Sequence, residues 1–256
     1  MVQSVRRAVR ILHELARGGP RLGVTELAER LGVAKPTVHA LLRTLASENL
    51  VSQDRDTGKY QLGPALVSLG NAYLGTHELR THSVAWADAL ATRVAESVWV
   101  AVLTGDRVLV VHHSLPPGES LQASEVGASV PWNTCALGKA IVAFSPPADR
   151  RRLTTGELTV LTGASITDPH ALAEQMEQVR RTGFALEDQE AALGDAGIAA
   201  PVFDRSGDVV GAIGVVGAVE RLSGEGPRRD VAVSVRETAR NLSRDLGASR
   251  HPARRT

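Results

Sequence analysis

Apolar side chains recur every three or four positions in three stretches of the first 50 residues, which is the period of an amphipathic helix. The first stretch is predicted to end at Gly18-Gly19-Pro20, because glycine and proline cannot continue a helix. Its inward face is predicted to consist of Val5, Val9, Leu12 and Leu15. An amphipathic helix therefore opens the chain.

The next two helical stretches are short and are separated by one tight turn. The first of them is predicted to begin at Thr25, a favourable N-cap residue, and to stop at Gly32. The other is entered through Pro36, whose fixed φ suits the first helical position. Its inward residues are Val38, Leu41, Leu42 and Leu45. Two short helices joined in this way are typical of a helix-turn-helix, which we place at residues 25–44.

The second of these short helices leaves a polar and basic side free at its N-terminal half, where a recognition helix reaches base edges. Strands at 50–53 and 59–62 around a polar turn then predict a β-hairpin wing, with Arg55 and Lys59 placed to meet phosphate. Residues 1–63 are therefore predicted to form a winged helix-turn-helix DNA-binding domain. The predicted DNA-contacting residues are Thr25, Lys35, Pro36, Thr37, His39, Arg43, Arg55, Lys59 and Tyr60.

A longer helical pattern follows, from Pro64 to about Glu96, with glycines at Gly70 and Gly75. We expect a linker helix over 64–95 that is kinked or split near Gly75-Thr76. Its apolar stripe suits contact with a partner subunit.

Beyond this helix the hydrophobic period changes to two, the period of a β-strand. Residues 97–114 predict two strands around Gly105-Asp106. Further strands are predicted at 184–187, 197–203 and 209–216, and helices at 136–144, 147–153, 169–182 and about 225–246. Antiparallel strands with segregated helices predict an α+β sensing domain over 78–248. The charged tail at 249–256 is predicted to be disordered.

Length and charge agree with this division. A chain of 256 residues is long enough for two modest domains. Residues 1–63 hold ten basic and six acidic side chains, a net charge of +4, so the remainder carries −3 of the total of +1. A basic head on an acidic body suits a phosphate-binding module joined to another function.

Several features indicate a cytoplasmic protein. The N-terminus lacks the continuous apolar core of a signal peptide, and no apolar run approaches the roughly 18 residues of a membrane-spanning helix. The single cysteine, Cys135, excludes an internal disulfide and fits a reducing compartment.

Over nearly its whole length the sequence resembles the IclR family of bacterial regulators. The matching segments are QSVRRAVRILHEL, VTELAERLGVAKPTVHALLRTL, GKYQLGPALVSLG, ALGKAIVAF, GFALEDQEAALGDAGIAAPVFD and VVGAIGVVGAVERL. The resemblance implies a GAF- or profilin-like C-terminal domain and a homodimer, or a dimer of dimers (a tetramer), that binds double-stranded promoter DNA. It also implies a small-molecule effector in the C-terminal domain, with an effector-binding set of Thr134, Cys135, Ala136, Leu137, Glu187, Asp188 and Glu190.

Within the family the chain most resembles actinobacterial regulators of glycerol operons, through THELR, ESVWVAVL, VLVVHHSLPPGESLQASEVGA, GAVERL and SRDLGASR. This similarity implies a repressor of a catabolic operon for glycerol metabolism and an effector of the polyol class, glycerol or glycerol 3-phosphate. The sequence departs from the family at Gly197, where cysteine is frequent, at Trp132-Asn133, where Leu-His is usual, and at Ala40, where arginine is common.

Two other functions stay open at this point. Cys135 with His112, His113 and Asp188 could serve a ligand-modifying enzyme, since an activated cysteine needs a neighbouring base. No catalytic signature surrounds Cys135, however, and adjacent histidines in a strand point to opposite faces, so that only one can enter a common site. We therefore expect no catalytic residues, no metal and no cofactor. The second alternative is a metabolite-binding module that only dimerises.

Overall fold

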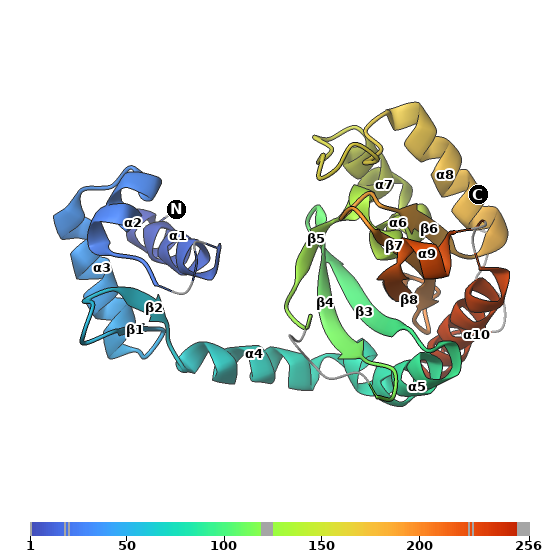
Figure 1. Ribbon diagram of the computed structural model, residues 1–256, viewed down its shortest axis with the longest axis horizontal. Coiled ribbons are helices and arrows are strands. Elements are labelled where there is room, and N and C mark those ends of the chain that lie inside the picture. Colours follow the sequence, from blue (N-terminus) through green and yellow to red (C-terminus); the bar gives the residue numbers. More distant parts are fainter. Residues whose placement is uncertain are drawn as a thin grey trace. The chain divides into compact units, whose positions relative to one another are not determined.

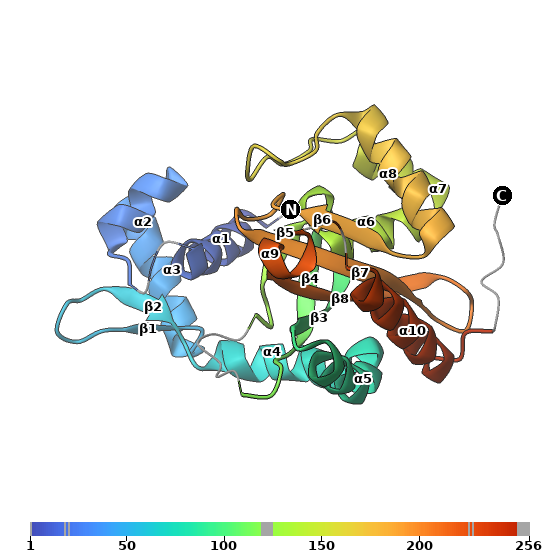
Figure 2. The ribbon, with the colours of Figure 1, turned by 45° about the vertical axis from the view of Figure 1, so that its right-hand side comes forward.

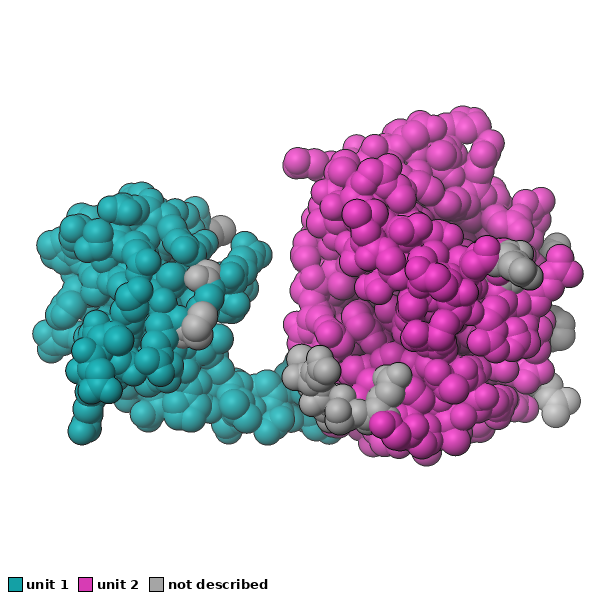
Figure 3. All heavy atoms as spheres, viewed as in Figure 1, with its two compact units in different colours: residues 1–76 teal, residues 77–256 magenta. Residues whose placement is uncertain are grey.

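The chain forms two compact units, divided between Thr76 and His77 (Figure 3). The computed structural model describes residues 2–17, 19, 21–118, 125–224, 226 and 228–249. Gly18 and Pro20 of the predicted first helix stop, and the predicted tail beyond Ser249, lie outside these described residues.

The N-terminal unit is a winged helix-turn-helix, as predicted. Its elements are α1 (Gln3–Arg17), α2 (Val24–Leu31), α3 (Lys35–Ser47), β1 (Val51–Gln53), β2 (Tyr60–Leu62) and α4 (Ala65–Thr76). The hairpin β1–β2 pairs antiparallel and projects beside α3, and Leu22 adds a bridge to Tyr60 (Figure 2). Its core takes one side of each of the first three helices and the inner face of the wing.

The prediction for the inward face of α1 was wrong in part. Ile11 and Leu15 are buried, whereas the side chains of Val5 and Val9 are 60% and 46% exposed. Ile11 and Leu15 lie four residues apart and so share one helical face, which packs against α2 and α3. The valines belong to a neighbouring stripe that the fold of this unit leaves uncovered.

The prediction that Thr25 caps α2 was also wrong. The helix begins one residue earlier, at Val24, with Gly23 in the capping position. The amide N–H of Gly23 donates to Oε2 of Glu26 at 2.6 Å. The carboxylate three residues after the cap thus satisfies an amide at the helix start, and Thr25 stays exposed in the first turn.

The C-terminal unit is a six-stranded antiparallel sheet covered by helices on both faces, which confirms the predicted α+β class (Figure 1). The sheet order is β5-β4-β3-β8-β7-β6. Helices α5 and α10 cover one face, and α6 packs on the other with α8 behind it. The helices are α5 (Glu78–Val94), α6 (Ala136–Phe144), α7 (Pro147–Thr154), α8 (Pro169–Thr182), α9 (Val219–Leu222) and α10 (Arg229–Asp245). The strands are β3 (Ser97–Thr104), β4 (Arg107–Ser114), β5 (Ser129–Pro131), β6 (Ala185–Asp188), β7 (Asp195–Phe203) and β8 (Val209–Ala218).

Three short elements were not predicted, namely β5, α9 and a 3₁₀ turn at Trp132–Thr134. Each has only three or four residues, too few for a hydrophobic period to be visible. The predicted linker helix is interrupted at His77, whose extended backbone (φ −81°, ψ 105°) separates α4 from α5. None of the described helices combines the length and apolarity that a bilayer-spanning segment requires.

Candidate functional site

The outer side of α3 is the polar surface that the sequence predicts. The turn before it contains Gly32, whose φ of 63° is the left-handed conformation that glycine adopts without steric cost. Val38, Leu42 and Leu45 are buried beneath the helix. On its outer side Lys35, Pro36, His39 and Arg43 are exposed and Thr37 is half-buried. Cationic, hydroxyl and imidazole groups therefore stand together on one free helix face.

The wing is held by its own turn. Oδ1 of Asp54 accepts from the amide and the hydroxyl of Thr57, at 2.8 and 2.7 Å, and these bonds are the main reason that the pKa of Asp54 is lowered. Arg55 is exposed next to this turn. Lys59 is also exposed, but its Nζ lies 3.6 Å from Oε2 of Glu26. The pKa of Glu26 is lowered mainly by its hydrogen bond from the Gly23 amide and then by the positive charge of Lys59. Lys59 therefore interacts electrostatically with α2.

Tyr60 is not on this surface. Its side chain is only 3% exposed and belongs to the core of the N-terminal unit. Its backbone exchanges hydrogen bonds with Leu22, at 2.8 and 2.9 Å. Side chains alternate between the two faces of a strand, and that of Tyr60 points into the core from β2. The prediction that Tyr60 contacts DNA was therefore wrong.

The C-terminal unit contains a cavity of about 290 Å³ beside the N-terminus of α6. Four of the seven predicted effector-binding residues line it, namely Cys135, Ala136, Leu137 and Glu187. The other lining residues that carry polar or aromatic groups are Trp99, Arg107, Ser129 and Asp195. The cavity therefore combines an apolar wall with one guanidinium and two carboxyl groups.

Three predicted residues do not line this cavity. The Thr134 hydroxyl donates to the Pro131 carbonyl at 3.1 Å in the interior. Asp188 is exposed because it follows Glu187 in β6 and points to the opposite face of the sheet. Glu190 is buried and forms an ion pair with the equally buried Lys139. Glu190 and Lys139 thus neutralise each other next to the cavity.

Glu187 is the strongest polar feature of the cavity. Its Oε1 accepts from the amides of Glu190 and Ala191, at 2.7 and 3.3 Å. Its Oε2 lies beside Gly197, where an added Cβ would come within 3.2 Å of it. Burial raises the pKa of Glu187 to about 7, against the smaller opposing effect of its amide hydrogen bonds. This carboxyl therefore changes charge near neutral pH.

Cys135 caps the start of α6 and is protonated. Its Sγ accepts from the Gly138 amide at 3.4 Å and donates to the Pro131 carbonyl at 3.6 Å. Burial raises the pKa of this thiol to about 12. A thiol of that acidity is a poor nucleophile at neutral pH, so Cys135 contributes structure and cavity wall.

The sequence analysis missed Arg107 and Ser129. Arg107 donates from Nε to the Ser129 hydroxyl at 2.9 Å and from a terminal nitrogen to the Ser129 carbonyl at 2.5 Å. Arg107 follows the predicted Gly105-Asp106 turn, where a charged residue indicates only solvent contact. Its position at the cavity depends on the pairing of β4 with β5, and β5 was not predicted.

The two histidines of β4 lie apart from this cavity. His112 contacts the Ser114 hydroxyl at 3.0 Å, and His113 contacts the Ser97 hydroxyl at 2.6 Å and packs edge-on against Trp99. Neither lines the cavity. Within the described ranges no group of three or more His, Cys, Asp or Glu side chains has a metal-binding arrangement.

Comparisons with known proteins give a family match for each of the two units. Residues 4–55 match the family model described as the IclR helix-turn-helix domain, and residues 71–244 match the model of the bacterial transcriptional regulator IclR C-terminal region. The glycerol operon regulatory proteins of Streptomyces griseus and Streptomyces coelicolor are 44% and 43% identical over 97% of this chain and 98% of theirs. A crystal structure of an IclR transcriptional regulator from Alicyclobacillus acidocaldarius superposes with a TM-score of 0.82 at 30% identity, covering 97% of this chain and all of that one.

Proposed function

Because the chain belongs to the IclR family of bacterial transcriptional regulators, we propose that it represses a glycerol catabolic operon under the control of a small metabolite. Regulators of this family bind DNA through the helix-turn-helix domain and an effector through the C-terminal domain, and they are not enzymes. The glycerol assignment is supported by the name that the two Streptomyces relatives share. A promoter-binding regulator acts where the chromosome lies, in the bacterial cytoplasm.

We assign the DNA-binding domain to residues 1–63, the linker to 64–95 and the effector-binding domain to 78–248. In a dimer, two copies of α3 would enter successive major grooves about 34 Å apart. Lys35 and Arg43 would supply base or phosphate contacts, and the exposed His39 and the half-buried Thr37 lie between them along α3. Thr25 and the wing residues Arg55 and Lys59 would contact the backbone on either side of α3.

Gel-shift titration tests this surface. Arg43→Ala should weaken binding to the promoter DNA upstream of the gene and reduce the salt slope of log K by about one if Arg43 contacts a phosphate. Arg93→Ala, an exposed arginine of α5, is the matched control and should leave both values unchanged. Equal affinity and slope for Arg43→Ala and the unchanged protein would contradict the geometry.

Homodimerisation, or assembly into a dimer of dimers, is supported by α4. None of the residues of this helix is buried within the chain. Its apolar residues Val67, Leu69 and Tyr73 are 66%, 61% and 46% exposed. Exposed apolar side chains in this number mark an interaction surface. Sedimentation of the Val67→Glu/Leu69→Glu variant should shift the protein toward monomer, and an unchanged oligomeric state would remove α4 from the interface.

The effector is proposed to be glycerol or glycerol 3-phosphate, bound in the cavity beside α6. The observation that carries this is the joint presence of Glu187 and Arg107 on a small cavity. A carboxylate accepts hydrogen bonds from hydroxyl groups, and a guanidinium near a helix N-terminus suits a phosphate. At about 290 Å³ the cavity is at the lower end of the range for ligand sites, which fits a three-carbon compound.

Calorimetry separates the two candidates. Glu187→Gln should weaken the binding of glycerol and of glycerol 3-phosphate, whereas Arg107→Gln should weaken only the phosphate ester. Asp188→Asn is the control, because Asp188 lies outside the cavity. Absence of heat with every three-carbon polyol would discard this ligand class. A gel shift with the effector then measures how far it changes the DNA-competent population.

A further inference from the structure

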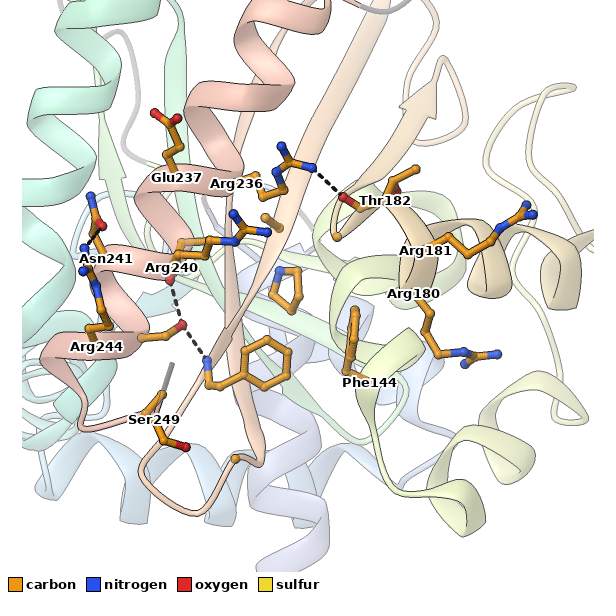
Figure 4. A pocket seen from close by; sticks show the side chains of 18 residues that line it. Phe144, Arg180, Arg181, Thr182, Arg236, Glu237, Arg240, Asn241, Arg244 and Ser249 are labelled. Atoms are coloured by element: carbon orange, nitrogen blue, oxygen red, sulfur yellow. Dashed lines mark hydrogen bonds between the residues drawn. The ribbon is translucent and has the colours of Figure 1, made fainter. Parts of the chain in front are cut away.

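A second and larger cleft lies in the C-terminal unit, between α8, α10 and the β7–β8 hairpin (Figure 4). It measures about 890 Å³ and has no lining residue in common with the effector cavity. Five arginines line it, namely Arg180, Arg181, Arg236, Arg240 and Arg244. Glu237 is the one carboxylate in that lining. The cleft is therefore strongly cationic.

The arrangement of three arginines on α10 is unfavourable without an anion. Arg236, Arg240 and Arg244 are spaced by four residues, so they follow one another along one helix face, and like charges at this spacing destabilise a helix. Glu237, the next residue after Arg236, is the single acidic side chain in this lining and so does not balance the row (Figure 4). The buried residues that pack α10 against the sheet are other side chains of this helix, so the packing of α10 does not depend on the whole row.

Arg236 and Arg240 leave donors free for a ligand in the cleft. Arg236 donates to the Thr182 carbonyl at 3.1 Å, but its buried Nε has no acceptor among the described residues. Arg240 has neither a hydrogen bond nor an ion pair with any part of the chain that the structure describes. Both side chains extend from α10 toward the α8 side of the cleft (Figure 4). Arg240 is exposed, whereas the Nε of Arg236 is buried, and a buried donor without a partner carries a cost that a bound acceptor would remove.

The remaining arginines are partly occupied. Arg180 forms an ion pair with Glu177 and donates to the Ala143 carbonyl at 2.9 Å. Arg181 donates to the side chain of Gln178, and Arg244 donates to the side chain of Asn241. These contacts fix the rim of the cleft. Of the five arginines only Arg180 has an ion pair among the described residues, so the positive charge of the other four is not balanced within the chain.

An apolar wall completes the cleft. The rings of Phe144 and Phe203 meet edge to face at 5.3 Å, and Pro201 lies beside them in the lining. Gly183 ends α8 with φ 78°, and a Cβ at this position would approach Cδ of Arg236 to 3.3 Å. Because Gly183 has no side chain, Arg236 has space to reach the Thr182 carbonyl.

From these observations we propose that the cleft is a second ligand site, which binds a small molecule with a phosphate group and an apolar or aromatic body. The phosphate would accept from Arg236 and Arg240, since guanidinium donors match tetrahedral oxyanions in charge and geometry. The body of the ligand would pack on Phe144, Phe203 and Pro201. This site is independent of the glycerol assignment and of the effector cavity.

The probes are phenyl phosphate, which joins the two features, and inorganic phosphate. Calorimetry on the full chain, at low ionic strength and at about 0.15 M, should show saturable binding of phenyl phosphate that weakens with salt. Inorganic phosphate should bind more weakly because it lacks the ring. Arg240→Gln and Arg236→Gln should each weaken phenyl phosphate binding by about tenfold or more.

Two control variants assign the heat to this cleft. Arg229→Gln removes the same charge from an exposed position of α10 outside the cleft, and it should leave the affinity unchanged. Arg107→Gln removes the cation of the effector cavity and should also have no effect. Arg240 is exposed and has no hydrogen bond or ion pair with the described residues, so its variant keeps the test valid even if Arg236→Gln is unstable.

Three outcomes would overturn the proposal. The first is absence of phenyl phosphate binding to the unchanged protein. The second is an equal loss of affinity in Arg229→Gln and Arg240→Gln, which would reduce the effect to general attraction by net charge. The third is loss of binding in Arg107→Gln alone, which would place the probe in the effector cavity.

Discussion

Replacing Glu187 by glutamine should stabilise the C-terminal unit at neutral and alkaline pH while weakening effector binding. Glu187 is buried, and its pKa is raised from 4.5 to about 7, mainly by burial. A carboxyl whose pKa is higher in the folded than in the unfolded state binds more protons when folded, so its ionisation lowers stability as pH rises. The cost is absent below about pH 4.5, grows between 4.5 and about 7, and is complete above that range.

The difference between 4.5 and about 7, at about 1.4 kcal/mol for each pH unit, corresponds to roughly 3 kcal/mol. Glutamine keeps an oxygen for the amides of Glu190 and Ala191 but carries no charge, so the variant should recover up to that amount above pH 7. For a unit of this size the gain corresponds to a rise in Tm of roughly 6–12 °C.

Urea unfolding followed by tryptophan fluorescence measures this gain. All three tryptophans, Trp86, Trp99 and Trp132, lie in the C-terminal unit, so the signal reports on that unit alone. The stabilisation should be present near pH 8 and vanish near pH 4.5. Asp188→Asn, an exposed neighbour on the opposite face, should show neither effect. A gain of equal size at both pH values, or no gain at pH 8, would refute the reasoning from burial.

Three further predictions concern other positions. Lys139→Met should destabilise the C-terminal unit by about 3–5 kcal/mol in urea unfolding, since it leaves Glu190 as a buried charge without its partner. The double variant Lys139→Met/Glu190→Gln should recover most of that loss. A double variant as unstable as the single one would disprove the pairing. Gly197→Ala should weaken effector binding in calorimetry, because the new Cβ would lie 3.2 Å from Oε2 of Glu187, and full affinity would show that the effector binds elsewhere. Tyr60→Phe should leave DNA affinity unchanged in gel shifts because Tyr60 is buried, and a clear loss with intact folding would return its hydroxyl to the DNA surface.

Most of the fold was predictable because its signals are local. Helix α6 and helix α8 have the predicted bounds, and β3 and β4 flank the predicted Gly105-Asp106 turn. The helix-turn-helix follows from leucine spacing together with Gly32 and Pro36, which act on the backbone within a few residues. Each of these signals requires no knowledge of what lies across the fold.

The cavity was predictable only in part. Cys135, Ala136, Leu137 and Glu187 came from resemblance to the family, and no spacing in the chain joins the start of α6 to β6. Arg107 was missed because an arginine after a turn has the same pattern whether it faces solvent or a cavity.

The sequence by itself determined the winged helix-turn-helix and the α+β class, since periodicity and turn residues act over short distances along the chain. Only the tertiary structure decided that Tyr60 is buried, that Glu190 pairs with Lys139, and that arginines of α8 and α10 line one cleft. Burial and charge pairing depend on which segments meet in three dimensions. That information arises from packing among elements that are distant in the sequence.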